Sequence, residues 1–140
     1  MNRYLFVIDY QNDFVDGALG FPGAEKLDGK IAAKIRAYGK GHVLFTRDTH
    51  FDNYLTPREG RNLPVVHCIH GTPGWEVYGE TARALAEVEA PGIDKLVFGM
   101  DVTDPATAAV LPETADEIEL VGLVSNICVV SNAVVLQSKY

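Results

Sequence analysis

An unbroken apolar run near the start of the chain, Tyr4–Ile8, ends at Asp9. Strands that are buried on both faces have this pattern, without alternation between apolar and polar residues. Further strand-like runs occupy 42–46, 93–98 and 117–121, and helix-like segments occupy 24–38, 80–89, 105–111 and 126–137. Strands that alternate with helices predict parallel βαβ units, and hence a three-layer α/β/α fold with a mostly parallel sheet. The length predicts a single domain over residues 1–140.

Two connecting regions are informative. The expected helix over 24–38 carries one apolar stripe, formed by Leu27, Ile31, Ile35 and Tyr38. Gly39 and Gly41 follow it and are expected to end it. Residues 51–77 form a long, irregular stretch that is rich in proline and glycine. A loop of that length in a compact domain is usually functional.

Composition and charge exclude several classes of protein. The formal net charge of −7 argues against nucleic acid as a partner. No apolar run is long enough to span a bilayer, and no basic segment leads into an apolar one as in a signal peptide. The two cysteines, Cys68 and Cys128, form no CxxC pair. This usage predicts a reduced, cytoplasmic setting rather than a disulfide scaffold.

Cys128 is a candidate nucleophile. It follows a strand-like run (117–121), a turn at Gly122, and Ser125, which we expect to cap the next helix. A thiol in the first turn of a helix meets partial positive charge and free N–H groups, which lower its pKa and can hold an oxyanion. The alternative is a small buried residue that packs this helix against the sheet.

Other reactive side chains are placed at equivalent strand ends. Asp9, Asp48, His50 and Cys128 all follow strand-like runs, and sites in such sheets gather at the carboxyl ends of the strands. Asp9 could take the thiol proton and return it to a leaving amine, or it could cap the loop at Gln11 and Asn12. Asp13 competes for the same role but lies further into the loop.

Lys95 has two interpretations. It is flanked by apolar residues and could stabilise a thiolate or an oxyanion if the strand ends near it. If Leu96–Phe98 is the strand instead, Lys95 lies at the wrong end and is a solvated side chain.

Four residues form a candidate metal site: Asp48, His50, Glu59 and His67. Asp48 and His50 lie on one side of an extended segment, and the other two follow in the long loop. Carboxylate and imidazole ligands suit Zn²⁺ foremost, with Mn²⁺ and Fe²⁺ as alternatives. His70 and His42 are alternative ligands, although His42 starts a strand and is expected to be structural.

Three aromatic residues, Phe14, Tyr54 and Trp75, could line a pocket for a flat ring or belong to the core. Phe14 is the one we assign to substrate binding. Cys68 is expected to be a buried thiol, because nothing places it at a helix N-terminus.

Together these segments resemble the cysteine hydrolases of the isochorismatase-like family, and nicotinamidases in particular. The resemblance rests on five segments in order, which are Asp9–Phe14, Thr46–His50, His67–Gly74, Lys95 with Phe98-Gly99, and Gly122–Val129. Each segment is weak alone, but the series spans nearly the whole chain.

The resemblance implies a catalytic triad of Asp9, Lys95 and Cys128. It also implies a cis peptide at Leu123–Val124, which directs the Val124 N–H toward the oxyanion beside the Cys128 N–H. It implies metal ligation by Asp48, His50 and His67, with Glu59 the least certain ligand. The implied reaction is hydrolysis of nicotinamide through a thioester, with a role in NAD salvage.

The chain departs from the family pattern in three places. Ser125-Asn126 stands where relatives usually have Thr-Asp, and no aromatic residue directly precedes His67. Relatives usually continue for a further strand and helix after the nucleophile helix, so we expect a shortened C-terminal layer. A sheet edge left open in this way would invite self-association, and we expect a homo-oligomer.

Two alternatives to nicotinamide hydrolysis remain open. One is another small amide, ureide or vinyl-ether substrate on the same fold. The other is an inactive, oligomerising binding protein, which would have no bound metal and an unactivated Cys128.

Overall fold

The computed structural model describes residues 1–56 and 58–140. Its strands are β1 (Arg3–Ile8), β2 (Val43–Asp48), β3 (Gly92–Lys95) and β4 (Glu117–Gly122). Its helices are α1 (Asn12–Val15), α2 (Asp28–Tyr38), α3 (Arg58–Asn62), α4 (Gly79–Glu87), α5 (Pro105–Val110) and α6 (Val130–Lys139). Short 3-10 turns occupy Ala24–Leu27 and Pro73–Trp75, and a π-helical turn occupies Ser125–Val129.

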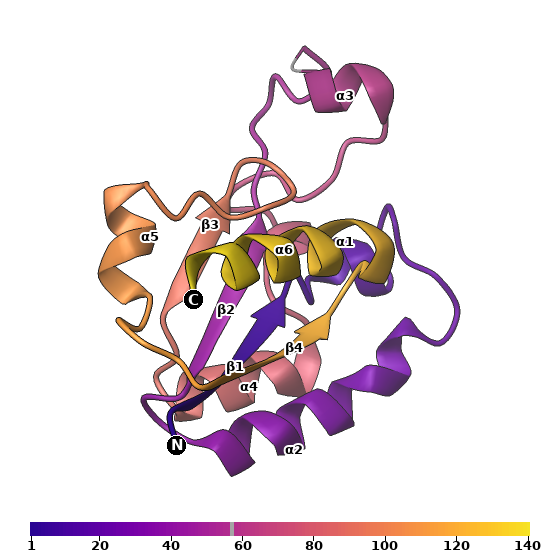
Figure 1. The fold of residues 1–140 in the computed structure, drawn as a ribbon. Coiled ribbons are helices and arrows are strands. Elements are labelled where there is room, and N and C mark those ends of the chain that lie inside the picture. The colour runs from indigo at the N-terminus through magenta and orange to yellow at the C-terminus, as the bar shows by residue number, and fades with distance from the viewer. Residues whose placement is uncertain (57) are drawn as a thin grey trace.

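The strands form one parallel sheet in the order β3-β2-β1-β4 (Figure 1). The chain adds β2 and β3 on one side of β1 and then crosses back to place β4 on the other side. Ile8 pairs with Thr46 on β2 and with Gly122 on β4. The direction in which the chain adds strands to the sheet therefore reverses between β1 and β4. Ligands of such sheets bind at this position, outside the carboxyl ends of the strands.

Helices cover both faces of the sheet. Alternate residues of β1 point to opposite faces, as the two-residue period of a strand requires. Leu5 and Val7 join the core cluster beneath α2 and α4, whereas Phe6 and Ile8 join the cluster beneath α5 and α6. All four side chains are at most 1% exposed. The predicted three-layer α/β/α fold with a mostly parallel sheet is confirmed.

The expected helix over 24–38 is divided. Residues Ala24–Leu27 form a 3-10 turn, and the α-helix begins only at Asp28. Ile31 and Ile35 are buried as the stripe predicted, but Leu27 belongs to the preceding turn and is 36% exposed. Gly39 ends α2 with a φ of 79°, a left-handed value that glycine adopts without steric cost.

Other boundaries also differ from the sequence expectation. The third strand ends at Lys95, so Leu96–Phe98 lies beyond it. The expected loop after Asp9 contains the short helix α1, and the stretch 51–77 contains α3 and a 3-10 turn, with Pro57 outside the described residues. The assignment of Ser125 as an N-cap was wrong. Val124 is the cap residue, and Ser125 is the first residue of the π-helical turn.

β3 and β4 are the edge strands of the described sheet. Self-association through an open edge stays a prediction. Among the described helices, none combines the length and apolar character needed to cross a membrane.

Candidate active site and metal centre

The register of the sheet brings the predicted site residues together. Asp9 directly follows β1, Asp48 is the last residue of β2, and Lys95 is the last residue of β3. Asp48 pairs with Lys95 across the β2–β3 ladder. Cys128 lies in the π-helical turn after β4. The carboxyl ends of the four parallel strands lie at the same end of the sheet (Figure 1). The structure thus favours the first interpretation of Lys95, as a residue at the carboxyl end of its strand.

Asp9 and Lys95 form an ion pair that is shielded from solvent. Lys95 Nζ lies 2.7 Å from Asp9 Oδ2, and both side chains are 0% exposed. The Thr46 hydroxyl donates a 2.6 Å hydrogen bond to Asp9 Oδ1. Burial raises the pKa of Asp9, while the Lys95 ammonium and the Thr46 hydroxyl oppose that rise. A carboxyl group with a raised pKa can both accept and return a proton near neutral pH.

Cys128 belongs to the core cluster under α6 and is 2% exposed. Burial raises the pKa of its thiol, and the Asp9 carboxylate raises it further. The Lys95 ammonium acts in the opposite direction and favours the thiolate. Burial and the Asp9 carboxylate thus favour the neutral thiol, and Lys95 favours the thiolate.

The turn before Cys128 has the conformation that the resemblance implied. The Leu123–Val124 peptide bond is cis. The Val124 carbonyl accepts hydrogen bonds from the N–H groups of Ile127 and Val129, each at 3.1 Å. These bonds fix the π-helical turn that carries Cys128.

The predicted metal ligands form one cluster. Single donor atoms of Asp48, His50, Glu59 and His67 all lie within 4.8 Å of one another. His50 Nε2 and His67 Nε2 lie 3.0 and 3.2 Å from Asp48 Oδ2. His50 Nε2 also lies 3.6 Å from Glu59 Oε1. The Glu59 side chain, which the sequence left least certain, is thus part of the cluster.

Two further observations show that this cluster fits a divalent cation. Asp48 Oδ1 and Glu59 Oε1 are buried oxygens that have no hydrogen-bond partner among the described residues. His67 Nδ1 lies 2.6 Å from the Val65 carbonyl, which fixes the tautomer and leaves Nε2 free to bind a metal. Although burial acts to raise it, the neighbouring His50 and His67 side chains and the Lys95 ammonium lower the pKa of Asp48, which favours the carboxylate form.

Gln11 is a supporting residue that the sequence interpretation missed. Its side chain is 0% exposed. Gln11 Nε2 donates to the carbonyls of Asp48 and Trp75 at 2.9 and 2.8 Å, and Gln11 Oε1 accepts from the Asp48 N–H at 2.8 Å. The side-chain amide of Gln11 thus binds both the N–H and the carbonyl of Asp48. Its place in the polar segment Asp9–Phe14, which follows the first apolar strand, was a signal in the sequence.

The three aromatic residues have different surroundings. Tyr54 packs edge-on against both histidines of the cluster, with centroids 4.5 Å from His50 and 5.0 Å from His67. Phe14 contacts His67 in the same way at 5.5 Å. Trp75 instead donates its indole N–H to Thr49 and stacks under the Arg47 guanidinium at 3.9 Å. Phe14 and Tyr54 therefore border the cluster, while Trp75 supports it from outside.

A pocket of about 340 Å³ opens beside the cluster. His50 and Glu59 form its inner wall, and the exposed side chains of Phe51, Leu96 and Val97 form its mouth. It gives small molecules a route to the metal ligands.

The alternative candidates take no part in the cluster. The Asp13 carboxylate accepts the Cys68 N–H at 2.8 Å, so it fixes a loop. Cys68 is 0% exposed, and burial raises its pKa, as expected for a structural thiol. His70 is exposed, and its ring lies 4.8 Å from that of Trp75 in a tilted arrangement.

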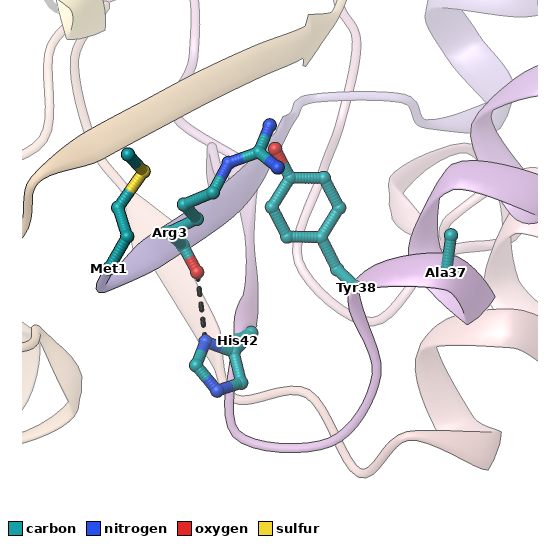
Figure 2. A pocket seen from close by; sticks show the side chains of 5 residues that line it. All are labelled: Met1, Arg3, Ala37, Tyr38 and His42. Carbon is teal, nitrogen blue, oxygen red and sulfur yellow. Dashed lines mark hydrogen bonds between the residues drawn. The ribbon is translucent and has the colours of Figure 1, made fainter.

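His42 lies at the opposite end of the sheet. It lines a separate hollow of about 300 Å³ with Met1, Arg3, Ala37 and Tyr38 (Figure 2). Its Nδ1 lies 2.8 Å from the Arg3 carbonyl, and its ring stacks on Tyr4. The expectation that His42 is structural agrees with these contacts.

Comparison with known proteins places this geometry in a family. A family model for the isochorismatase domain matches residues 3–137. The nicotinamidase/pyrazinamidase of Mycobacterium tuberculosis is 28% identical over 139 residues, which cover 91% of this chain and 74% of that protein. The match spans most of the relative but not all of it.

Solved structures agree. The nicotinamidase/pyrazinamidase PncA of Bacillus subtilis superposes with a TM-score of 0.83 at 28% identity, covering 99% of this chain and 80% of that one. An N-carbamoylsarcosine amidase of Thermoplasma acidophilum superposes with a TM-score of 0.76 at 26% identity, covering 100% and 79%. The parallel sheet, the strand-end residues and the match to residues 3–137 lead to one conclusion: this chain belongs to the isochorismatase family, and its hydrolase relatives include nicotinamidases.

Proposed function

We propose that this protein is a metal-containing cysteine amidase that hydrolyses nicotinamide to nicotinate and ammonia. The proposal rests on one observation, which is that two groups of residues lie together at the carboxyl ends of the strands. The buried Asp9–Lys95 pair lies beside Cys128, and the four-residue cluster lies next to Lys95. The similarity to nicotinamidases supports nicotinamide as the substrate.

Asp9 and Cys128 would carry the acyl transfer. Asp9 accepts the Cys128 proton as the sulfur attacks the amide carbonyl, and a tetrahedral oxyanion forms. The N–H groups of Val124 and Cys128 would hold this oxyanion, a contribution of about 2.7–4 kcal/mol per donor in comparable sites. Asp9 then gives the proton to the departing nitrogen, which leaves as ammonia and yields a thioester on Cys128. Water, activated by Asp9, hydrolyses the thioester and restores the thiol.

Lys95 would hold the charges in place during these steps. Its ammonium lies 2.7 Å from Asp9 and favours the Cys128 thiolate. It keeps Asp9 oriented while the proton moves between sulfur and nitrogen. Phe14 and Tyr54, which border the cluster, offer ring edges to a flat substrate.

Asp48, His50, Glu59 and His67 would hold the metal ion, with Zn²⁺ as the first choice for this donor set. When bound, the ion would offer a Lewis-acidic position that orients a ring nitrogen of the substrate. The protein residues would exclude bulk water, because each of these ligands is buried or half-buried.

The test is ammonia release from nicotinamide with and without a chelator, with Cys128→Ala as the blank. We expect release that requires both the metal and Cys128. Release that persists in Cys128→Ala would refute the mechanism.

A second candidate is a ureide amidase, favoured by the match to N-carbamoylsarcosine amidase. Hydrolysis of small ureides with no turnover of nicotinamide would select it. A protein with no bound metal, no turnover of either substrate class and an unreactive Cys128 would instead be a binding module.

A further inference from the structure

We infer that Asn132 is a positioning residue, which holds the nucleophile turn against the segment that follows Lys95. This inference rests on the proposed cysteine mechanism. Asn132 lies in α6, four residues after Cys128, and its side chain is 0% exposed. It is a polar side chain directed into the apolar cluster that also contains Cys128 and Met100.

The side chain of Asn132 makes three hydrogen bonds, all to backbone groups. Its Nδ2 donates to the Cys128 carbonyl at 2.7 Å and to the Phe98 carbonyl at 3.1 Å. Its Oδ1 accepts from the Met100 N–H at 2.8 Å. Both amide protons and the amide oxygen are therefore used, and one buried residue joins two chain segments.

These segments hold the two sides of the proposed reaction centre. One is the π-helical turn that carries Cys128, and the other is the chain that leaves β3 immediately after Lys95. That chain passes close to α6 (Figure 1), and a Cβ at Gly99 would lie 3.2 Å from Val135. Lys95 Nζ also donates to the Val97 carbonyl at 3.3 Å. The segment that Asn132 binds therefore also contacts the Lys95 ammonium group.

The connection therefore runs from the sulfur-bearing residue to the ion pair. Asn132 joins Cys128 to residues 98–100, and these lead through Val97 to Lys95 and Asp9. Asn132 does not touch the reacting atoms. Its effect is on the distance and angle between the thiol and the Asp9–Lys95 pair. Acyl transfer is sensitive to such placement, and a shift of about 1 Å can cost about 100-fold in rate.

A purely structural explanation predicts a different outcome. A buried amide whose hydrogen bonds are lost destabilises the fold. If that were its only role, substitution would lower the melting temperature and leave the turnover of the folded protein unchanged. Thr81 provides the matched control because it is also 0% exposed and its hydroxyl donates to Asp28 at 2.8 Å, on the opposite face of the sheet.

The experiment compares Asn132→Leu, Asn132→Ser and Thr81→Val with the unmodified protein. Leucine removes all three hydrogen bonds. Serine can still bond the carbonyl four residues earlier in the helix but is too short to reach residues 98–100. We expect both Asn132 variants to lower kcat about 10- to 100-fold with KM and metal content unchanged, whereas Thr81→Val lowers only the melting temperature.

Alkylation by iodoacetamide gives a readout that needs no substrate. The rates at Cys128 and Cys68 are followed separately by mass spectrometry. Loss of the Asn132 bonds should uncover Cys128 and speed its alkylation several-fold, while Cys68, in the other core cluster, keeps its rate. General loosening of the fold would speed both.

The outcomes separate the two proposals. Unchanged kcat together with unchanged Cys128 alkylation in folded Asn132→Ser would overturn the positioning role. If Asn132→Leu fails to fold, the results for Asn132→Ser alone test the positioning role. If the unmodified protein releases no ammonia from nicotinamide, the substrate proposal fails, and the Cys128 to Cys68 alkylation ratio still tests Asn132.

Discussion

Lys95 Nζ lies 2.7 Å from Asp9 Oδ2 and 4.0 Å from Asp48 Oδ1, and all three side chains are almost completely buried. One ammonium group thus lies between the proposed base and the metal cluster. A charge that loses its partner inside a protein costs several kcal/mol. Substitution of any one of these residues should therefore change the electrostatic environment of the other two.

Replacing the nucleophile should separate chemistry from folding. Cys128→Ala removes the sulfur from the core cluster, so we expect ammonia release to be abolished while stability falls by about 1 kcal/mol. Cys68→Ala is the matched control, because Cys68 is an equally buried thiol outside the proposed triad. Both variants are assayed for ammonia and thermal unfolding. Equal activity in the two variants would contradict the assignment.

Asp9→Asn should change thiol reactivity and turnover in opposite directions. The Asp9 carboxylate raises the pKa of Cys128, and Lys95 lowers it. Without the carboxylate, the ammonium is left with the thiolate as its partner, so alkylation of Cys128 at neutral pH should become faster. Turnover should fall about 10²- to 10⁴-fold, because the general base is lost. Parallel alkylation and ammonia assays check this, and a joint fall in both rates would argue against the charge arrangement.

The acid limb of the pH–rate profile should report on Asp9. Burial raises the pKa of Asp9, and Asp9 must be ionised to accept the thiol proton, so activity should be lost at a higher pH than an ordinary carboxyl group would give. The Thr46 hydroxyl bond opposes this rise. Thr46→Val should therefore move the acid limb to a higher pH. A limb that stays in place would show that Asp9 does not control it.

Among the histidines, those of the cluster should control the metal content. His50→Ala removes one donor from the cluster, so we expect bound Zn²⁺ per chain to fall and the affinity to drop at least about 10-fold. His42→Ala should keep full metal content, because His42 directly precedes β2 whereas Asp48 ends that strand. Its ring lines the separate hollow of Figure 2. Elemental analysis after dialysis measures both. Full metal retention in His50→Ala would refute the site.

Asp28 should stabilise the fold without affecting activity. Its carboxylate accepts the N–H groups of Glu80 and Thr81 at 2.9 and 2.8 Å, and so caps α4 from the start of α2. We expect Asp28→Ala to cost about 1–2 kcal/mol of unfolding free energy with an unchanged kcat. Asp28→Asn, which keeps an acceptor, should lose less. Denaturant titration provides the values, and equal losses in the two variants would contradict the capping role.

The sequence alone predicted the layers of the fold and the residues at the ends of its strands. An apolar run such as Tyr4–Ile8 indicates a buried strand, and it can be recognised from the order of the residues alone. The placement of Asp9 and Asp48 after such runs followed from the same pattern, because parallel strands end at one edge. Gly39 also ended α2 where expected, because its left-handed φ is a local property.

The sequence named the candidate groups, but it left some contacts between distant segments open and missed others. Whether Lys95 faced the site depended on where β3 ended, and the pairing of Asp48 with Lys95 decided it. The sequence likewise did not indicate the π-helical turn that displaced Ser125 from the cap position and that carries Cys128 in the core cluster. Local propensity carries little information about such choices, because tertiary contacts override it.

The roles of Gln11 and Asn132 came only from the tertiary structure. Each is a buried amide whose partners are backbone groups on other segments, and in sequence each is one polar residue among many. Glu59 differs, because the sequence named it as the least certain ligand, and the structure places its carboxylate beside His50. The sequence determined which chemical groups stand at the strand ends. Only the folded chain decided which of them meet, because hydrogen bonds and ion pairs act over a few ångströms in space regardless of distance along the chain.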